Sequence, residues 1–190
     1  MEAIDVPPAS AMHRGSLDKM DTNDANVEVV VETPKGSRNK YAFDPKRKIF
    51  TLKKVLPAGM SFPYDFGFVP STRGGDGDPI DVLVLMDEPA FPGCVLNCRP
   101  IGVIEGEQVS DGQTQRNDRV VAVQEDNHSY AAIAHIDDLG KPFVRELGQF
   151  FTNYHELWGD TFTVLGVRGP RDARKCIDDG RRSATRKKRR

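Results

Sequence analysis

Three aspartates within six residues form the strongest chemical pattern in the chain: Asp76, Asp78 and Asp81. Carboxylates a few ångströms apart repel each other, and burial makes this repulsion more costly unless a positive charge neutralises it. Carboxylate oxygens suit hard divalent cations such as Mg²⁺. Gly77 allows a tight turn, and Pro79 fixes φ just before an apolar run begins. The spacing favours an oxygen-lined metal site over the alternative, an acidic turn that caps a strand.

The apolar run behind these acids predicts the strand that positions them. Asp81 opens the run, and residues 82–85 are Val, Leu, Val and Leu, which favour a strand. Because side chains alternate along a strand, the two leucines share the face of Asp81 and the two valines take the other face. We therefore predict a rigid buried strand with the acids at its mouth.

Other segments predict a small barrel of strands followed by helices. Apolar β-forming runs bounded by turn residues occur at residues 27–34, 40–43, 48–53, 95–104 and 119–123. Pro100 inside the fourth run requires a sheet edge or a bulge. Short connections between this many strands favour a closed antiparallel barrel. Beyond the barrel, apolar periodicity and proline placement predict a helix within residues 143–158, a strand at 161–167 and a helix at 170–180.

Length and composition indicate one soluble domain with terminal extensions. The chain has 190 residues, with no apolar stretch long enough to cross a membrane and no signal-peptide core near its start. We expect a flexible leader at residues 1–25, a single domain at residues 26–178 and a basic disordered tail at residues 179–190. Three cysteines, an odd number, favour a reducing cytoplasm over a disulfide framework.

The formal net charge of −1 hides an asymmetry between body and tail. The chain has 27 Lys and Arg against 28 Asp and Glu, and its last ten residues contain seven basic residues and no acid. Without them, 20 basic residues face 28 acidic ones, a formal charge of −8. An acidic body argues against a general nucleic-acid binder. From the tail we expect at most weak, salt-sensitive contacts with polyanions.

The nine residues Asp-Gly-Asp-Pro-Ile-Asp-Val-Leu-Val, starting at Asp76, resemble the signature of the soluble Mg²⁺-dependent inorganic pyrophosphatases of family I. Other segments resemble this family in the same order along the chain: residues 31–34, 40–41, 62–63, 67, 92–93, 98–103 and 150–154. The resemblance covers about residues 26–177. The predicted domain at residues 26–178 is therefore expected to be pyrophosphatase-like.

The resemblance implies an α+β fold: a small OB-like antiparallel β-barrel flanked by two or more helices. It also implies a homo-oligomer, usually a hexamer in bacteria, and a reaction in which pyrophosphate is hydrolysed to two phosphates with several Mg²⁺ ions. This chemistry agrees with the residues, because metals neutralise a dense anion and generate hydroxide while cationic side chains hold the phosphates.

The resemblance assigns roles to individual residues. Asp78 corresponds to the general base that deprotonates a metal-bound water, and Asp76 and Asp81 correspond to metal ligands. Lys40 and Tyr154 correspond to residues that contact the substrate phosphates. Glu32 corresponds to an acid behind the residues that touch the substrate.

Several positions depart from the family pattern. Ala42 stands where an acid is expected, and Lys53 stands for an arginine, which keeps the charge but loses the bidentate fork. Phe62 and Phe66 replace tyrosines, so two hydroxyl donors are missing. His155 replaces a lysine as a substrate contact, and we expect its charge to depend on pH. These changes indicate a divergent member with fewer or weaker metal sites.

The largest departure lies at the mouth of the strand that begins near residue 119. The family has an acid two residues before a lysine, whereas Asn117 and Arg119 fill these positions here. Asp118 is adjacent, but one step along a strand reverses the face, so it could act only from a loop or a bulge. We treat Asn117 and Asp118 as candidate metal ligands and Arg119 as a candidate substrate contact.

The predicted polar hairpin loop at residues 105–116 leaves a further alternative open. The loop is longer than the family pattern leads us to expect, so the missing acid could map to Asp111 or to Glu107. Asp111 is therefore also a candidate metal ligand.

Two rival functions stay open on the sequence alone. Phe62 and Phe66 could line an apolar approach for an organic phosphoanhydride, with ordinary core packing as the alternative. The chain could also be a low-activity or non-catalytic homologue that binds phosphate or nucleic acid through its barrel and basic tail.

Overall fold

The computed structural model describes residues 26–188, so the predicted leader at residues 1–25 lies outside the described residues. The elements in chain order are β1 (Val27–Thr33), β2 (Asn39–Asp44), β3 (Ile49–Val55), β4 (Asp65–Phe68), β5 (Asp81–Leu85), β6 (Val95–Ser110), β7 (Gln113–Arg116), β8 (Arg119–Gln124), a 3₁₀ helix η1 (Ile136–Leu139), α1 (Lys141–Glu156), β9 (Thr161–Arg168) and α2 (Pro170–Lys188). Neither α-helix in this part of the chain is long and apolar enough to cross a membrane.

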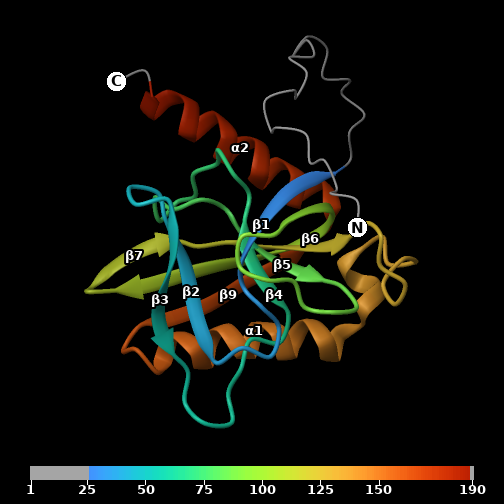
Figure 1. The fold of residues 1–190 in the computed structure, drawn as a ribbon, viewed down its shortest axis with the longest axis horizontal. Coiled ribbons are helices and arrows are strands. Elements are labelled where there is room, and N and C mark those ends of the chain that lie inside the picture. Colours follow the sequence, from blue (N-terminus) through green and yellow to red (C-terminus); the bar gives the residue numbers. More distant parts are fainter. Residues whose placement is uncertain (1–25, 189–190) are drawn as a thin grey trace, which may run out of the picture.

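Five strands close into a ring, which confirms the predicted OB-like barrel and the α+β class (Figure 1). β1 pairs with β4, β4 with β5, β5 with β8 and β8 with β6, and β6 returns to β1. The purely antiparallel prediction is wrong at one pairing, because β5 and β8 run parallel with Asp81 opposite Arg119. The register of β6 against β8 shifts between Pro100 and Gly102, which is the bulge that the proline required.

Both faces of β5 are buried, as its sequence predicts. The two valines of β5 pack into one apolar cluster with Ala173 and Ile177 of α2. Its two leucines pack into a second cluster with Leu147 and Phe151 of α1. Figure 1 accordingly shows the two α-helices on opposite sides of the barrel. The strand that carries Asp81 is thus clamped between two cores.

Helix α2 is longer than predicted, and the prediction of a disordered tail from residue 179 is wrong up to Lys188. Gly180, predicted to end the helix, instead lets the helix approach the loop before β5. A Cβ at this position would lie 2.8 Å from Cγ1 of Ile80. Ion pairs between Arg181 and Asp178 and between Arg182 and Asp179 add side-chain contacts one turn apart.

The hairpin of β2 and β3 forms a two-stranded sheet of its own, separate from the barrel sheet. It is attached to β1 through β2, because the Phe43 N–H donates to Glu32 Oε1 at 2.7 Å and the Tyr41 N–H donates to Thr33 Oγ1 at 3.0 Å. On β3, several apolar side chains stay exposed: Ile49, Leu52 and Val55.

Candidate active site

A cavity of about 650 Å³ lies between the β2–β3 hairpin, the loop before β5, the start of β8 and the end of α1. Ten of the twelve residues predicted to form the site line it: Glu32, Lys40, Lys53, Asp76, Asp78, Asp81, Asn117, Arg119, Tyr154 and His155. The other two, Asp111 and Asp118, do not. Residues far apart in sequence therefore converge on one polar cavity.

The acidic loop is held in shape by its own backbone. Gly77 has φ +94°, in the left-handed region, and the Gly74 N–H donates to the Asp78 carbonyl at 2.7 Å. The Asp78 N–H donates to the Asp76 carboxylate at 3.1 Å. The Asp78 carboxylate is exposed and has no hydrogen bond or ion pair within the described chain. It is thus the acid of the loop that is free to accept a proton from a bound molecule.

Asp76 experiences the electrostatic cost that the sequence indicates. Burial raises the pKa of Asp76 to about 6, and the nearby carboxylates of Asp81 and Asp78 act in the same direction. The backbone N–H of Asp78 and the guanidinium of Arg119 lower this pKa but do not offset the rise. A cation at this position would remove the cost.

Arg119 supplies one such cation from within the chain. Parallel pairing of β5 with β8 puts it opposite Asp81, and its Nη1 lies 2.6 Å from Asp81 Oδ2. The guanidinium is 5% exposed and packs among three aromatic rings, at 5.3 Å from Phe151, 5.6 Å from Phe162 and 6.0 Å from Phe66. Its Nε has no hydrogen-bond partner in the described chain. Arg119 is therefore a fixed internal counterion of Asp81.

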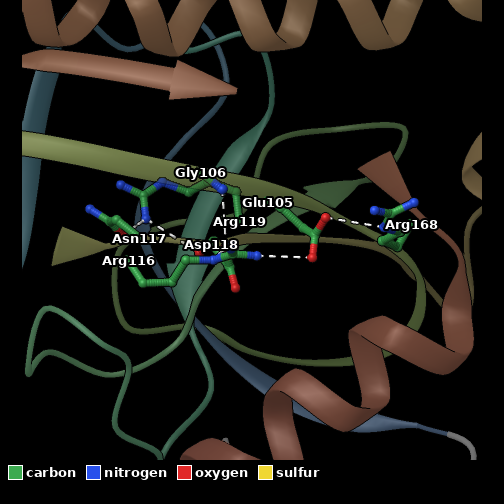
Figure 2. Close-up of polar contacts among 7 residues, drawn as sticks. All are labelled: Glu105, Gly106, Arg116, Asn117, Asp118, Arg119 and Arg168. Atoms are coloured by element: carbon green, nitrogen blue, oxygen red, sulfur yellow. Dashed lines mark hydrogen bonds and ion pairs between the residues drawn. The ribbon is translucent and has the colours of Figure 1, made fainter. Parts of the chain in front are cut away.

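Asn117 and Asp118, the two residues between β7 and β8, point to different places. The buried Asn117 amide donates to Gln108 Oε1 at 2.7 Å and accepts a hydrogen bond from Arg119. The Asp118 carboxylate turns away, accepting from Gly106 N–H at 3.0 Å and pairing with Arg116 Nε at 2.6 Å (Figure 2). Asn117 thus holds Arg119 in the cavity, whereas Asp118 lines a second cavity of about 290 Å³ together with Asp76, Asp81 and Asn117.

The Asp118–Arg116 pair belongs to a larger ion network. Arg116 Nη2 lies 2.9 Å from Glu105, and the other carboxylate oxygen of Glu105 lies 3.1 Å from Arg168 Nε of β9 (Figure 2). This network lines the outer side of the segment that leads into β8 and fixes the strand mouth. Sequence reasoning missed it, because it joins residues on three different strands.

Asp111 lies far from this chemistry. The predicted polar loop at residues 105–116 is instead a regular hairpin of β6 and β7, whose turn is formed by Asp111 and Gly112. Both turn residues are exposed and have positive φ. Glu107 lies within β6, opposite Arg116, and is not among the residues that line the cavity. Neither of the two loop acids that the sequence offered for the position near residue 117, Asp111 and Glu107, therefore lines the cavity.

The opposite wall of the cavity is basic. The Lys40 ammonium lies 4.3 Å from the centroid of the Phe66 ring, and burial lowers the pKa of Lys40. Asp81 and Glu32 oppose this shift. Burial raises the pKa of Glu32, whose carboxylate accepts the hydrogen bond from Phe43. Phe66 and Phe62 are core residues behind Lys40 and do not line the cavity, so they provide no apolar approach for an organic substrate.

Sequence reasoning missed Lys54, which lines the cavity together with Lys53. Lys53 is exposed, whereas Lys54 is half-buried. The register between β2 and β3 shifts between Lys40 and Tyr41, so counting along the strands does not identify which lysine faces inward. The sequence therefore contains no pattern that identifies Lys54, rather than Lys53, as the half-buried lysine.

The end of α1 contributes Tyr154 and His155. Burial raises the pKa of Tyr154 to about 12, so the phenol keeps its proton and can donate it in a hydrogen bond. Burial, and then the charge of Arg119, lowers the pKa of His155 to about 4. The imidazole stacks on Phe162 with ring centroids 5.1 Å apart, and its Nε2 has no partner among the described residues. At neutral pH, His155 is therefore uncharged and does not replace the lysine expected there.

The donor set fits a hard divalent cation, although the described chain contains no group of three His, Cys, Asp or Glu side chains already gathered around one point. Asp76, Asp78 and Asp81 line one cavity, and burial, with the neighbouring carboxylates, raises the pKa of Asp76. Oxygen ligands of this kind are what Mg²⁺ prefers.

Comparison with known proteins agrees with this arrangement. The Pyrophosphatase family model, described as inorganic pyrophosphatase, matches residues 29–185. The inorganic pyrophosphatase of Synechocystis sp. is 39% identical over 140 residues, which cover 74% of this chain and 80% of that protein. The inorganic pyrophosphatase of Geobacillus stearothermophilus is 36% identical over 80% of this chain and 90% of that one. The chain therefore belongs to the inorganic pyrophosphatase family.

Solved structures share the fold. The inorganic pyrophosphatase of Thermus thermophilus superposes with a TM-score of 0.79 at 32% identity, covering 87% of this chain and 94% of that chain. The inorganic pyrophosphatase of Neisseria gonorrhoeae gives a TM-score of 0.78 at 30% identity, covering 87% and 95%. The similarity thus extends over the barrel and the segments that surround the cavity.

Proposed function

We propose that this protein is an inorganic diphosphatase that hydrolyses pyrophosphate to two phosphates with Mg²⁺. The observation that carries the proposal is a single cavity in which three carboxylates face the cationic side chains of Lys40 and Arg119. The names of its relatives support the same reaction.

In this proposal Asp78 is the general base. Its carboxylate faces the cavity and is free of other partners in the described chain, so it can take a proton from water as the water oxygen bonds to phosphorus and the bridging P–O bond breaks. Mg²⁺ bound by Asp76 and Asp81 would neutralise the phosphate charge and acidify the attacking water. Lys40 and Tyr154 hold the phosphates, and Glu32 orients the hairpin through Phe43.

Arg119 reduces the positive charge that bound metal must supply to the cavity. Because Asp81 already has an internal counterion, the site needs less positive charge from solution than three unpaired acids would need. We infer fewer or weaker metal sites, in keeping with Asn117 at the position expected to be acidic. A single domain that begins near residue 26 and includes all of α2, a cytoplasmic location and a homo-oligomer, with a hexamer as the expected form, complete the proposal.

The test is release of phosphate from pyrophosphate across a range of Mg²⁺ concentrations, measured with malachite green. Wild-type protein should show Mg²⁺-dependent turnover, and Asp78→Asn should lower kcat about 10²- to 10⁴-fold. Because Asp78 is exposed, the melting temperature of the variant should match that of the wild type. Exposed Asp126→Asn serves as the matched control. Absence of turnover at every Mg²⁺ and Mn²⁺ concentration would refute the proposal.

A further inference from the structure

Lys54 differs from Arg119 in having no acidic partner within the described residues. Its ammonium forms no ion pair or hydrogen bond within the described chain. Instead the Nζ lies 4.3 Å from the centroid of the Trp158 ring. Arg119, by contrast, is neutralised by Asp81 at 2.6 Å. An aromatic face attracts a cation through its quadrupole but brings no opposite charge, so Lys54 is held in place with its charge intact.

The ring that holds Lys54 comes from the end of α1. Trp158 lies just beyond the end of α1, and its backbone N–H donates to the backbone carbonyl of His155 at 2.9 Å. The same helical turn thus places Tyr154 and His155 in the cavity and Trp158 at its rim. The contact joins the segment that follows α1 to β3, which belongs to the separate two-stranded sheet.

This contact involves the outer strand of the hairpin. β2 is hydrogen-bonded to β1 through side chains of Glu32 and Thr33, but β3 is the outer strand of its two-stranded sheet. Val55, next to Lys54, is 50% exposed. The Trp158 ring therefore fixes a side chain on the more weakly supported strand.

The charge of Lys54 acts on the cavity. The ammonium contributes to lowering the pKa of Lys40 and, to a smaller extent than burial and Arg119, that of His155. Lys54 also lines the cavity beside Lys53. It is thus a cation presented to the same space as the carboxylates, on the opposite wall.

We propose that Trp158 is a positioning residue, which holds the Lys54 ammonium at the cavity rim without neutralising it, so that Lys54 binds a phosphate group of pyrophosphate. The inference rests on the proposed function. Once a phosphate enters, the Lys54 ammonium donates a charge-assisted hydrogen bond to a phosphate oxygen while it stays over the Trp158 ring, so the ring fixes the position from which Lys54 binds the anion.

The first test separates the π face of Trp158 from its bulk. Trp158→Leu should raise KM for pyrophosphate about two- to fivefold with little change in kcat. The variant loses the ring that positions Lys54, and Lys54 binds phosphate equally well in the ground state and the transition state. Trp158→Phe keeps an aromatic face and should restore KM towards the wild-type value. Lys54→Met should raise KM about 10- to 100-fold, since a charge-assisted hydrogen bond is lost.

Two further comparisons show whether Trp158 acts through Lys54. Adding Trp158→Leu to Lys54→Met should raise KM no further, because the ring then has no cation to hold. Leu157→Ala, at the adjacent exposed position, should leave KM unchanged. Full additivity in the double variant would overturn the inference, as would equal KM values for wild type and Trp158→Leu.

The second test does not depend on turnover. Trp158 is the one tryptophan in the sequence, so its fluorescence reports on this contact alone. Titration with inorganic phosphate should change the emission of the wild type and leave that of Lys54→Met unchanged. An identical response in both proteins would overturn the inference. Failure of the wild type to hydrolyse pyrophosphate would instead refute the proposed function, and the phosphate titration would still test the role of Trp158.

Discussion

The two walls of the cavity are built differently. The acidic wall belongs to β5 and its preceding loop, and β5 is paired on both sides within a closed ring of strands. The basic wall is the β2–β3 hairpin, which lies outside that ring. A two-stranded hairpin by itself is only marginally stable in water. Residues expected to hold a metal are thus fixed by the barrel, whereas residues expected to hold phosphate are carried by a more adjustable element.

This difference predicts opposite consequences for substitutions on the two walls. Changes to the buried ion pair on the barrel side should alter folding stability strongly, because removal of one partner leaves the other charge uncompensated. Changes on the hairpin side should alter substrate binding and leave stability nearly unchanged.

Arg119→Leu should cause the largest loss of stability. It removes the buried counterion of Asp81 and leaves a partly buried carboxylate uncompensated, which costs about 3–5 kcal/mol. Thermal unfolding should show a melting temperature about 10 °C lower. Arg168→Leu is the matched control, because Arg168 is exposed and its ion pair with Glu105 contributes little. Equal losses for the two variants would show that the buried Arg119–Asp81 pair contributes no more to stability than an exposed ion pair.

Acid should destabilise the protein through His155. Its folded-state pKa of about 4 lies below the ordinary value of 6.5, so the stability that the neutral ring contributes is complete above pH 6.5 and is lost as the pH falls through about 4. The loss reaches about 3 kcal/mol. Urea unfolding between pH 7 and pH 4 should show a shallower decline for His155→Gln. Exposed His128→Gln should follow the wild-type curve, and a His155→Gln curve of wild-type slope would contradict the assignment.

Asp76→Asn should stabilise the protein in the absence of metal. The raised pKa of Asp76 means that its ionised form is disfavoured by the fold, so stability falls as the pH rises through about 6. At pH 7.5 with EDTA, the variant should melt about 2–4 °C higher than the wild type. Mg²⁺ should stabilise the wild type and have less effect on the variant. A lower melting temperature for Asp76→Asn in EDTA would show that the acid is structural.

Lys53→Ala should have the smallest effect on both measurements. The side chain is exposed on the hairpin, so the free energy of unfolding should change by no more than about 0.5 kcal/mol. KM for pyrophosphate should rise less than it does in Lys54→Met. Lys53 and Lys54 are neighbours in β3, so the two variants compare adjacent positions on one strand. A larger rise in KM for Lys53→Ala would assign the phosphate contact to Lys53, as the sequence alone suggested.

The barrel strand β5 could be predicted from sequence because its information is local. Alternating apolar residues follow Asp81 directly, and the acids precede it by a turn that Gly77 and Pro79 permit. The parallel pairing with β8 could not be predicted, because nothing near Arg119 in the sequence identifies its neighbour in the sheet. The ion pair between Arg119 and Asp81 is a consequence of that pairing and was missed for the same reason.

Other differences arise from packing. Gly180 reads as a helix end, and only the close approach to Ile80 explains why the helix continues through it. His155 reads as a residue that titrates near neutral pH, and only its burial beside Arg119 and Phe162 explains why it stays uncharged. In each of these cases the residue type was known, but its surroundings come from elements distant in the chain.

The parallel pairing of β5 with β8 also has a consequence for the order of events during folding. Strands that run parallel cannot be joined by a short turn, so the chain that carries β6 and β7 must fold back before Asp81 and Arg119 can meet. The entropy of closing this long loop is lost before the contact returns any energy. A refolding chain should therefore regain its secondary structure first and its catalytic competence last, when the ring of strands closes.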